Sequence, residues 1–319
     1  MPDDQAASAT RGRQADRPTQ VLPSGWKDIL SRSWQEILDN NIFLIAGGVT
    51  YAIVLALFPG LAALVSMYGL LLDPGQIEKQ VGALNGVLPE QSRQLLIDEL
   101  HQLASASGGA LGFGTFVGIL LALWSASRGM SGLISATNIA YEQKETRNFL
   151  KFNLIALLLT LGVILGGMVA IALIAVLPTA AQFLDGGFRW VLMLIEWPAL
   201  IILVMSGLAV LYRYAPNRDQ PQWHWVSPGA IAATLLWSLG SIGFTVYVTN
   251  FGSYNKTYGS LGGVVVLLTW LYLSAFAMVL GAVVNAQSER QTHRGATEGP
   301  PERMGRRDAY AADTLGPNT

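Results

Sequence analysis

Six long runs of apolar residues, separated by short polar stretches, dominate this chain. A bilayer core about 30 Å thick takes about 20 helical residues to cross, and every run is near that length or longer. Because backbone groups in lipid must pair within the chain, helices are the expected spanning form. We therefore predict an all-α, polytopic membrane helix bundle with six transmembrane helices. The predicted spans are 42–72, 104–127, 154–177, 190–212, 226–249 and 261–284.

Composition argues against the rival interpretation, a large soluble helical core. Charged residues are 13% of the chain and hydrophobic residues 51%, whereas soluble domains average roughly 25% charged residues. The run 154–177 is apolar around its whole circumference, and a soluble helix needs a polar stripe. The chain has no cysteine, so disulfides and thiolate metal sites are excluded. Its net charge of −1 gives no reason to expect a nucleic-acid partner.

The 20 basic residues are distributed unevenly between the two sides of the predicted bundle. Sixteen fall in the N-terminal tail, the second and fourth connections and the C-terminal tail, and four fall in the other three connections. Basic residues concentrate on the cytoplasmic side of membrane proteins. The distribution therefore predicts that both the N-terminus and the C-terminus are cytoplasmic, which agrees with an even number of spans.

The chain divides into a membrane domain and two polar tails. We expect residues 1–23 and 288–319 to be disordered, because both are polar and poor in apolar residues, and residues 24–287 to form the membrane domain. Residues 24–41 have the apolar spacing of an amphipathic helix, either on the inner membrane face or packed under the bundle. Residues 73–103 predict short amphipathic helices at the outer interface.

The first run is too long for one straight span. As a single helix its 31 residues extend about 46 Å, which exceeds the bilayer core. Pro59, in the sequence LFPG, is expected to kink or break it. A kink has a structural role, whereas a broken helix lines a cavity. The predicted hinge or break positions are Pro59, Gly60, Gly252 and Gly259.

Few charged or amide side chains lie near membrane depth. Glu196 lies in the fourth span and is either a functional intramembrane acid or an interfacial carboxylate among aromatic residues. Arg128 follows the second span, where it is either a snorkelling inner anchor or a residue of a cavity. The same helix is expected to carry a surface salt-bridge set, Asn138, Glu142, Glu145 and Arg147, of which Asn138 is a cavity candidate.

The segment 250–263, NFGSYNKTYGSLGG, is the most unusual local sequence. Its glycines permit backbone shapes that other residues avoid, and its side chains offer many hydrogen-bonding groups. The segment is either a tight outer turn or a re-entrant, pore-lining element that contacts a polar head group or solute. The candidate substrate contacts are Asn250, Ser253, Tyr254, Asn255, Lys256 and Tyr258.

The sequence contains no recognisable catalytic or cofactor-binding motif. No two of the three histidines, His101, His224 and His293, have the spacing of metal ligands. The chain also has no GxSxG, Walker or dinucleotide-binding motif. We therefore expect no enzymatic activity, no metal, no cofactor and no ATP-driven pumping within this chain.

Several motifs in order resemble the YihY/virulence factor BrkB family, whose members are often catalogued as ribonuclease BN. They are AGGVTYAIVLALFPGLAALVSMYGL at 46–70, LWSASRGMSGLISATNIAYEQKETRNF at 123–149, LYRYAP at 211–216 and YVTNFGSYNKTYGSLGGVVVLLTWLYLSAFAMVLGAVVNA at 247–286. The resemblance covers roughly residues 25–288. It implies a bacterial inner-membrane protein with six spans, for which the ribonuclease label is regarded as a misassignment, and it points to the movement of lipids or other envelope molecules.

From these observations we expect a non-ATP-driven transporter or flippase-like protein for a lipid or another amphiphilic envelope molecule. A cavity bounded by 42–72, the second span and 250–263 is expected to admit the head group while the lipid tails stay in the bilayer. The alternative is a membrane scaffold that recruits envelope protein partners. The sequence leaves the substrate, the direction and energy source of transport and the oligomeric state open.

Overall fold

The computed structural model describes residues 11–69, 113–181, 187–250, 260–293, 296–297 and 304–317. In this part of the chain it is all-α, apart from one isolated β-bridge between Pro221 and Thr297. Six helices are long and apolar enough to cross a membrane, which confirms the predicted bundle. The elements are η1 (Pro18–Gln20), α2 (Pro23–Asp39), α3 (Ile42–Gly69), α6 (Phe113–Ala140), α7 (Phe149–Ala181), α8 (Gly187–Tyr214), α9 (Trp223–Asn250), α11 (Ser260–Glu289) and α12 (Tyr310–Asp313).

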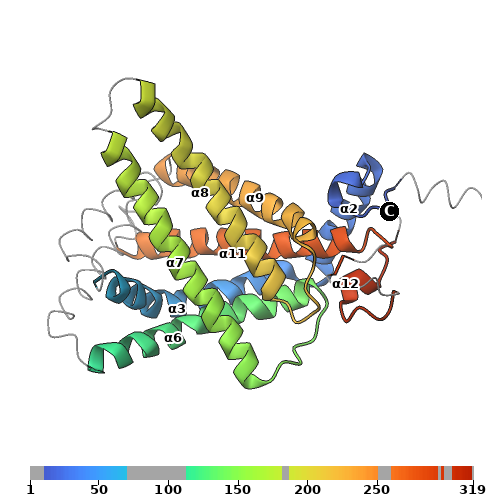
Figure 1. Cartoon of the computed structure of the whole chain (residues 1–319), viewed down its shortest axis with the longest axis horizontal. Coiled ribbons are helices and arrows are strands. Elements are labelled where there is room, and N and C mark those ends of the chain that lie inside the picture. Colours follow the sequence, from blue (N-terminus) through green and yellow to red (C-terminus); the bar gives the residue numbers. More distant parts are fainter. Residues whose placement is uncertain are drawn as a thin grey trace, which may run out of the picture.

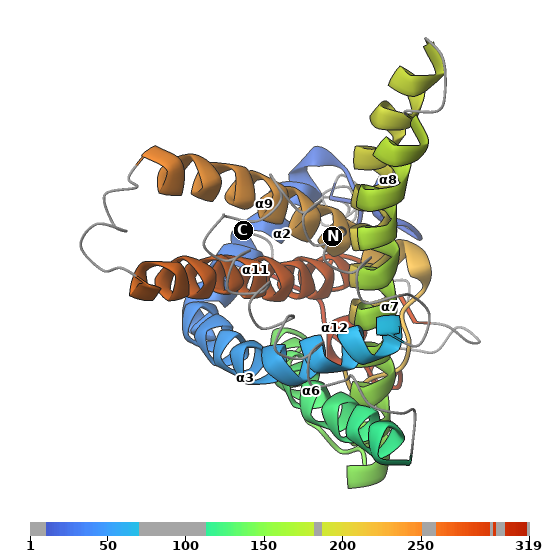
Figure 2. The same cartoon turned by 90° about the vertical axis from the view of Figure 1, so that its left-hand side faces the viewer.

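Helix α11 is the central element, since it contacts α2, α3, α6, α9 and α12. Helix α3 packs along α6, and α9 packs along α11. Helices α7 and α8 pack on each other and cross the other long helices obliquely (Figures 1 and 2).

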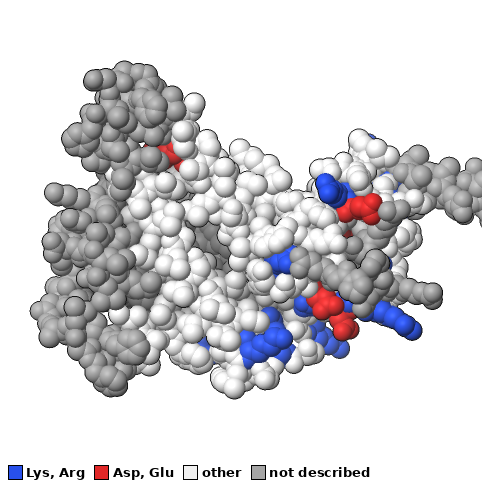
Figure 3. All heavy atoms as spheres, in the orientation of Figure 1, with Lys and Arg blue, Asp and Glu red and all other residues white. Residues whose placement is uncertain are grey.

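The buried core is concentrated at one end of the bundle. Tyr141, Tyr212 and Trp225, which are fully buried, lie where α6 ends, where α8 ends and where α9 begins. Figure 3 shows most of the visible Lys, Arg, Asp and Glu side chains at this same end, one acidic side chain towards the other end, and none in the middle of the visible face. The long helices are therefore held together mainly at the charged end.

Helix α6 differs from the predicted second span, 104–127. Residues 104–112 lie outside the described residues, and the helix continues past Arg128 to Ala140. It continues because its small residues pack closely on α3: a Cβ added at Gly129 would lie 2.6 Å from the Cβ of Ala56. This continuation agrees with the expectation that the helix carries Asn138, and it makes Arg128 an interior residue of α6.

Helix α3 is continuous from Ile42 to Gly69, with Pro59 inside it. Figure 2 shows that this helix bends along its length. Proline removes one backbone hydrogen bond and clashes with the preceding turn, which is a usual cause of a kink. The predicted hinge at Pro59 is therefore a bend within one helix in this structure.

The described parts of the two polar tails contact each other and α2. The Arg13 guanidinium donates a 2.7 Å hydrogen bond to the carbonyl of Gly316, and the Arg32 guanidinium donates to Gln291 Oε1 (2.7 Å) and to the carbonyl of Pro317 (3.0 Å). Burial, with a smaller effect of nearby Arg13, lowers the pKa of Arg32 to about 10. Polar composition suggested disorder, but these polar groups bind one another and join the two tails at the end of the bundle.

Helix α2 packs against the bundle, which is one of the two roles that the sequence left open. One face buries Asp28, Ile29 and Arg32 against the bundle. The other face exposes Leu30, Trp34 and Leu38, which recur every four residues. The predicted outer helices within 73–103 and the segment 251–259 lie outside the described residues.

The closest helix contact provides a test of the fold. A Cβ added at Gly229 of α9 would lie 2.0 Å from the carbonyl oxygen of Gly281 in α11, whereas a Cβ at Gly240 meets nothing within 4 Å. We predict that Gly229→Ala lowers the free energy of unfolding by about 1–3 kcal/mol through overpacking. Gly240→Ala, the matched control on the same helix, is expected to be neutral or slightly stabilising. Thermal unfolding in detergent measures both, and equal effects would contradict the proposed contact.

Candidate functional site

A cavity of about 540 Å³ lies at membrane depth in the bundle. Six helices contribute to its wall, represented by Gly60 of α3, Met130 of α6, Ile164 of α7, Leu208 of α8 and Trp237 of α9, together with α11. The face shown in Figure 3 is hollowed between α7 and α8, over α11. The volume falls within the range of about 300–1,000 Å³ that is typical of ligand pockets.

The wall of the cavity offers apolar groups to a ligand. It contains no Asp, Glu, Lys, Arg or His among the residues that the structure describes there. Its main polar groups bind each other: Trp237 Nε1 donates to Ser274 Oγ (3.0 Å), and Ser274 Oγ donates to the carbonyl of Trp270 (2.9 Å). Thr160 Oγ1 donates to the carbonyl of Ala156 (2.7 Å). The lining therefore suits a hydrocarbon, and it differs from the expected cavity that admits a polar head group.

Of the sequence-predicted site residues that the structure describes, one lines this cavity. Gly60 lines it, next to Pro59 in α3. Glu196 lies near the other end of α8 from Tyr214, half-exposed between exposed Ile195 and Trp197. Asn250 is the last residue of α9. The remaining candidates of that segment lie outside the described residues, namely Gly252, Ser253, Tyr254, Asn255, Lys256, Tyr258 and Gly259.

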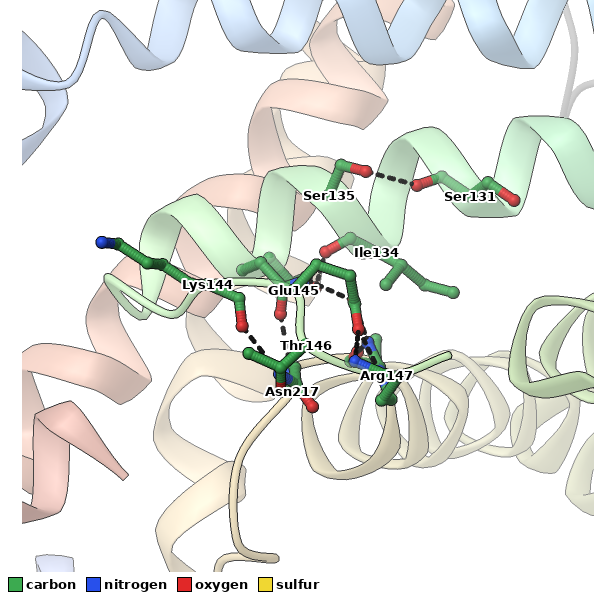
Figure 4. Close-up of polar contacts among 11 residues, drawn as sticks. Ser131, Ile134, Ser135, Lys144, Glu145, Thr146, Arg147 and Asn217 are labelled. Atoms are coloured by element: carbon green, nitrogen blue, oxygen red, sulfur yellow. Dashed lines mark hydrogen bonds and ion pairs between the residues drawn. The ribbon is translucent and has the colours of Figure 1, made fainter. Parts of the chain in front are cut away.

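Asn138 is a buried residue outside the cavity wall. It belongs to a partly exposed polar cluster whose members Glu145, Arg147 and Asn217 come from two connections (Figure 4). Its Nδ2 donates to Glu145 Oε2 (2.9 Å), and its Oδ1 accepts from the backbone N–H of Asn217 (2.7 Å). Arg147 donates to both oxygens of Glu145, at 2.8 and 2.6 Å. Asn217 Nδ2 also donates to the carbonyl of Lys144 and to Thr146 Oγ1. Glu145 and Arg147 thus belong to the connection after α6, not to the helical continuation expected from the sequence.

A second polar cluster at the same end, which is buried, was not predicted from the sequence. Arg218 and Glu289 form an ion pair in which neither side chain is exposed to solvent. Arg218 also lies over the ring of Tyr141, 4.1 Å from its centroid. Burial opposes the charge on Arg218, but Glu289 and Tyr141 outweigh that effect and raise its pKa above the ordinary value. No local sequence pattern marked these three residues, which lie in three different segments of the chain.

Comparison with known proteins agrees with this architecture. The pattern of the family described as virulence factor BrkB matches residues 33–305. The chain belongs to the virulence factor BrkB family. This BrkB-family protein is 33% identical to a protein of Bacillus subtilis named "Putative ribonuclease-like protein YfkH", over 75% of this chain and 86% of the relative.

Two further relatives carry names that state only membrane location. The UPF0761 membrane protein IL2447 of Idiomarina loihiensis is 27% identical, over 80% of this chain and 88% of its own length. The UPF0761 membrane protein VP0125 of Vibrio parahaemolyticus is 28% identical, over 87% of both chains. No solved structure matches the chain. The BrkB-family protein is therefore a multi-pass membrane protein whose relatives share most of its length.

Removing one partner of the buried ion pair is predicted to be costly. Arg218→Ala leaves Glu289 buried and uncompensated, and we expect the free energy of unfolding to fall by about 3–5 kcal/mol. The control is Arg290→Ala, because the Arg290–Glu142 pair is more exposed and such pairs contribute less than about 1 kcal/mol. Thermal unfolding in detergent compares the two variants. The double exchange Arg218→Met with Glu289→Met is expected to be milder than Arg218→Ala, and equal losses for Arg218→Ala and Arg290→Ala would contradict this account.

The Glu145 cluster is predicted to weaken in acid. Burial favours the neutral carboxyl, but hydrogen bonds from the Arg147 side chain and backbone and from Asn138 outweigh it and hold the pKa of Glu145 below its ordinary value. A depressed pKa adds stability above the unfolded pKa, and this stability is lost as pH falls through the folded pKa.

The corresponding measurement compares wild type with Glu145→Gln by thermal unfolding from pH 7 to pH 3. We expect wild type to be more stable by about 1 kcal/mol at neutral pH, and the difference to shrink below the unfolded pKa of Glu, about 4.3. A difference that stays constant across this range would show that the charge of Glu145 is not what stabilises the cluster.

Proposed function

We propose that this BrkB-family protein is a non-ATP-driven transporter or flippase-like protein for a lipid or another amphiphilic envelope molecule. The observation that supports this proposal is the cavity of about 540 Å³ at membrane depth, whose wall carries no charged side chain among the described residues. Water finds no hydrogen-bond partners in such a cavity, whereas a hydrocarbon chain lowers its free energy by entering it. An amphiphile that leaves the bilayer plane needs a place of this kind for its apolar part.

We further propose that the charged end of the bundle is cytoplasmic. The tails and the connections 141–148 and 215–222 lie at this end, and Figure 3 shows its concentration of charged side chains. The positive-inside rule then places both termini in the cytoplasm of a bacterial inner membrane. Reporter tags at each terminus test the assignment, which a tag on the far side of the membrane would contradict.

Filling the cavity is predicted to stop transport without unfolding the protein. A Cβ at Gly60 would meet only the Cβ of Ala126, at 3.8 Å, so a larger side chain there extends into the cavity. We expect Gly60→Phe to reduce head-group translocation in reconstituted vesicles by about tenfold, equivalent to about 1.4 kcal/mol in the barrier. Gly60→Ala is the matched control and is expected to retain most of the wild-type rate.

Three outcomes would contradict the proposal. Wild-type rates equal to those of protein-free vesicles for several lipid classes would remove the transport function. Equal rates for wild type and Gly60→Phe would show that the cavity is not on the route. A loss in Gly60→Ala as large as that in Gly60→Phe would indicate a general effect on α3.

A membrane scaffold is the second candidate, and the joined tails favour it. Residues 304–317 pack against the N-terminal segment and α11 to form a folded surface outside the membrane spans. A scaffold predicts that deleting 304–317 abolishes cellular function while translocation by the purified protein is unchanged. We propose no ribonuclease activity for this chain, and cleavage of RNA by pure protein that a single substitution abolishes would refute that.

A further inference from the structure

Arg128 occupies an unusual position for a charged residue. The part of α6 that can cross a membrane is Gly118–Ala140, so Arg128 lies ten residues after its start and twelve before its end. At 1.5 Å per residue these distances are about 15 Å and 18 Å. A snorkelling side chain covers only part of either distance, so the guanidinium lies within the length of this candidate span.

The surroundings of Arg128 offer polar groups but no counter-charge. Its side chain is exposed, and the guanidinium lies 5.0 Å from the ring centroid of Trp124, one turn earlier. Within the described part of the chain, each carboxylate that forms an ion pair does so with a residue other than Arg128. The Trp124 ring offsets only part of the cost of a cation in lipid. Among the described residues no carboxylate forms an ion pair with Arg128, so this position is open to an anion.

A stripe of serines extends along the same side of α6. Ser125 and Ser135 are exposed and Ser131 is half-exposed. Ser125 lies three residues before Arg128, Ser131 three after it and Ser135 four after Ser131, which is helical spacing. The hydroxyls of Ser131 and Ser135 donate to the carbonyls one turn earlier, at 3.0 and 2.9 Å, so their oxygens can still accept hydrogen bonds. Figure 4 shows both serines on a side of α6 away from the Glu145–Arg147 pair. We call Ser125, Arg128, Ser131 and Ser135 the α6 polar stripe.

The opposite side of α6 has different chemistry. Ala126, Met130 and Leu133 line the apolar cavity. Residues 126 and 130 lie about 200° around the helix from position 128, so the polar stripe and the cavity are on different faces. The head-group chemistry that the cavity lacks is thus present on the other face of the same helix.

We propose that Arg128 and the α6 polar stripe bind the phosphate of an anionic lipid. This rests on the proposed function, because it names the substrate class that the transporter handles. A guanidinium presents a planar fork of donors that fits two phosphate oxygens. Phospholipid is the source of phosphate that reaches an exposed side chain inside a bilayer, whereas a free phosphate ion has to lose its hydration to do so.

Binding in detergent tests this site separately from transport. The purified full chain is titrated with dihexanoyl phosphatidylglycerol and with dihexanoylglycerol, which lacks the phosphate, and heats of binding are recorded. We expect Arg128→Gln to weaken phosphatidylglycerol binding about tenfold, which is about 1.4 kcal/mol, and to leave dihexanoylglycerol binding unchanged. Arg128→Lys keeps the charge but loses the planar fork of donors, so we expect its affinity for phosphatidylglycerol to fall by an intermediate factor of about threefold. If Arg128→Gln fails to fold, the affinity of Arg128→Lys tests the proposal instead.

The matched control is Lys27→Gln, which removes an exposed cation outside the spans. Wild-type affinity in Arg128→Gln, an equal loss in Lys27→Gln, or equal wild-type affinity for the two lipids would overturn the proposal. Displacement of the lipid by millimolar inorganic phosphate would overturn the lipid assignment and indicate a soluble anion. Tight, Arg128-dependent binding by a protein that moves no lipid in vesicles would support this site and refute the proposed function.

Discussion

The constraint on which the structure depends is that lipid supplies no hydrogen bonds. Every backbone group in the spans must be paired within the chain, which makes each span a helix. Hydroxyl groups follow the same rule: Thr50, Thr160 and Thr234 each donate to the carbonyl four residues earlier. Polar side chains inside the membrane are in this way satisfied locally. A side chain such as Arg128, which the helix cannot satisfy, therefore stands out as a candidate for ligand binding.

The same constraint determines how the helices associate. Lipid tails are as apolar as the helices, so close packing and polar contacts rather than hydrophobic burial bring helices together. At the charged end both are present, in the Gly229–Gly281 contact and in the Arg218–Glu289 pair. Asn285 adds to this by accepting from the backbone N–H of Gly229 and donating to the carbonyl of Val226. Anchoring at one end leaves room for a cavity at membrane depth.

Helix α6 links the two chemical requirements of an amphiphile. One face contributes Met130 and Leu133 to an apolar cavity, and the other carries Arg128 and the serines. Its charged end is held by Asn138 and by Tyr141 just beyond it, which join it to the connection after α8 and to Arg218. A motion of α6 relative to α3 and α11 would move the cavity wall and the α6 polar stripe together. In the proposed transporter, one conformational change would then act on both the head group and the hydrocarbon chain.

Sequence and structure contributed different parts of this description. The apolar runs determined the number and type of the spans, because length and hydropathy are properties of each segment alone. The bend at Pro59 was also predicted locally, since proline acts on its own turn. The helix of the second span was expected to continue through Glu145 and Arg147, whereas α6 ends at Ala140 and these two residues lie in the connection that follows. Only the tertiary structure decided that Asn138 binds Asn217, that Arg218 pairs with Glu289 and that the two tails meet, because these contacts join residues 71 to 303 positions apart. No local pattern specifies which of many polar groups will be neighbours after the helices pack.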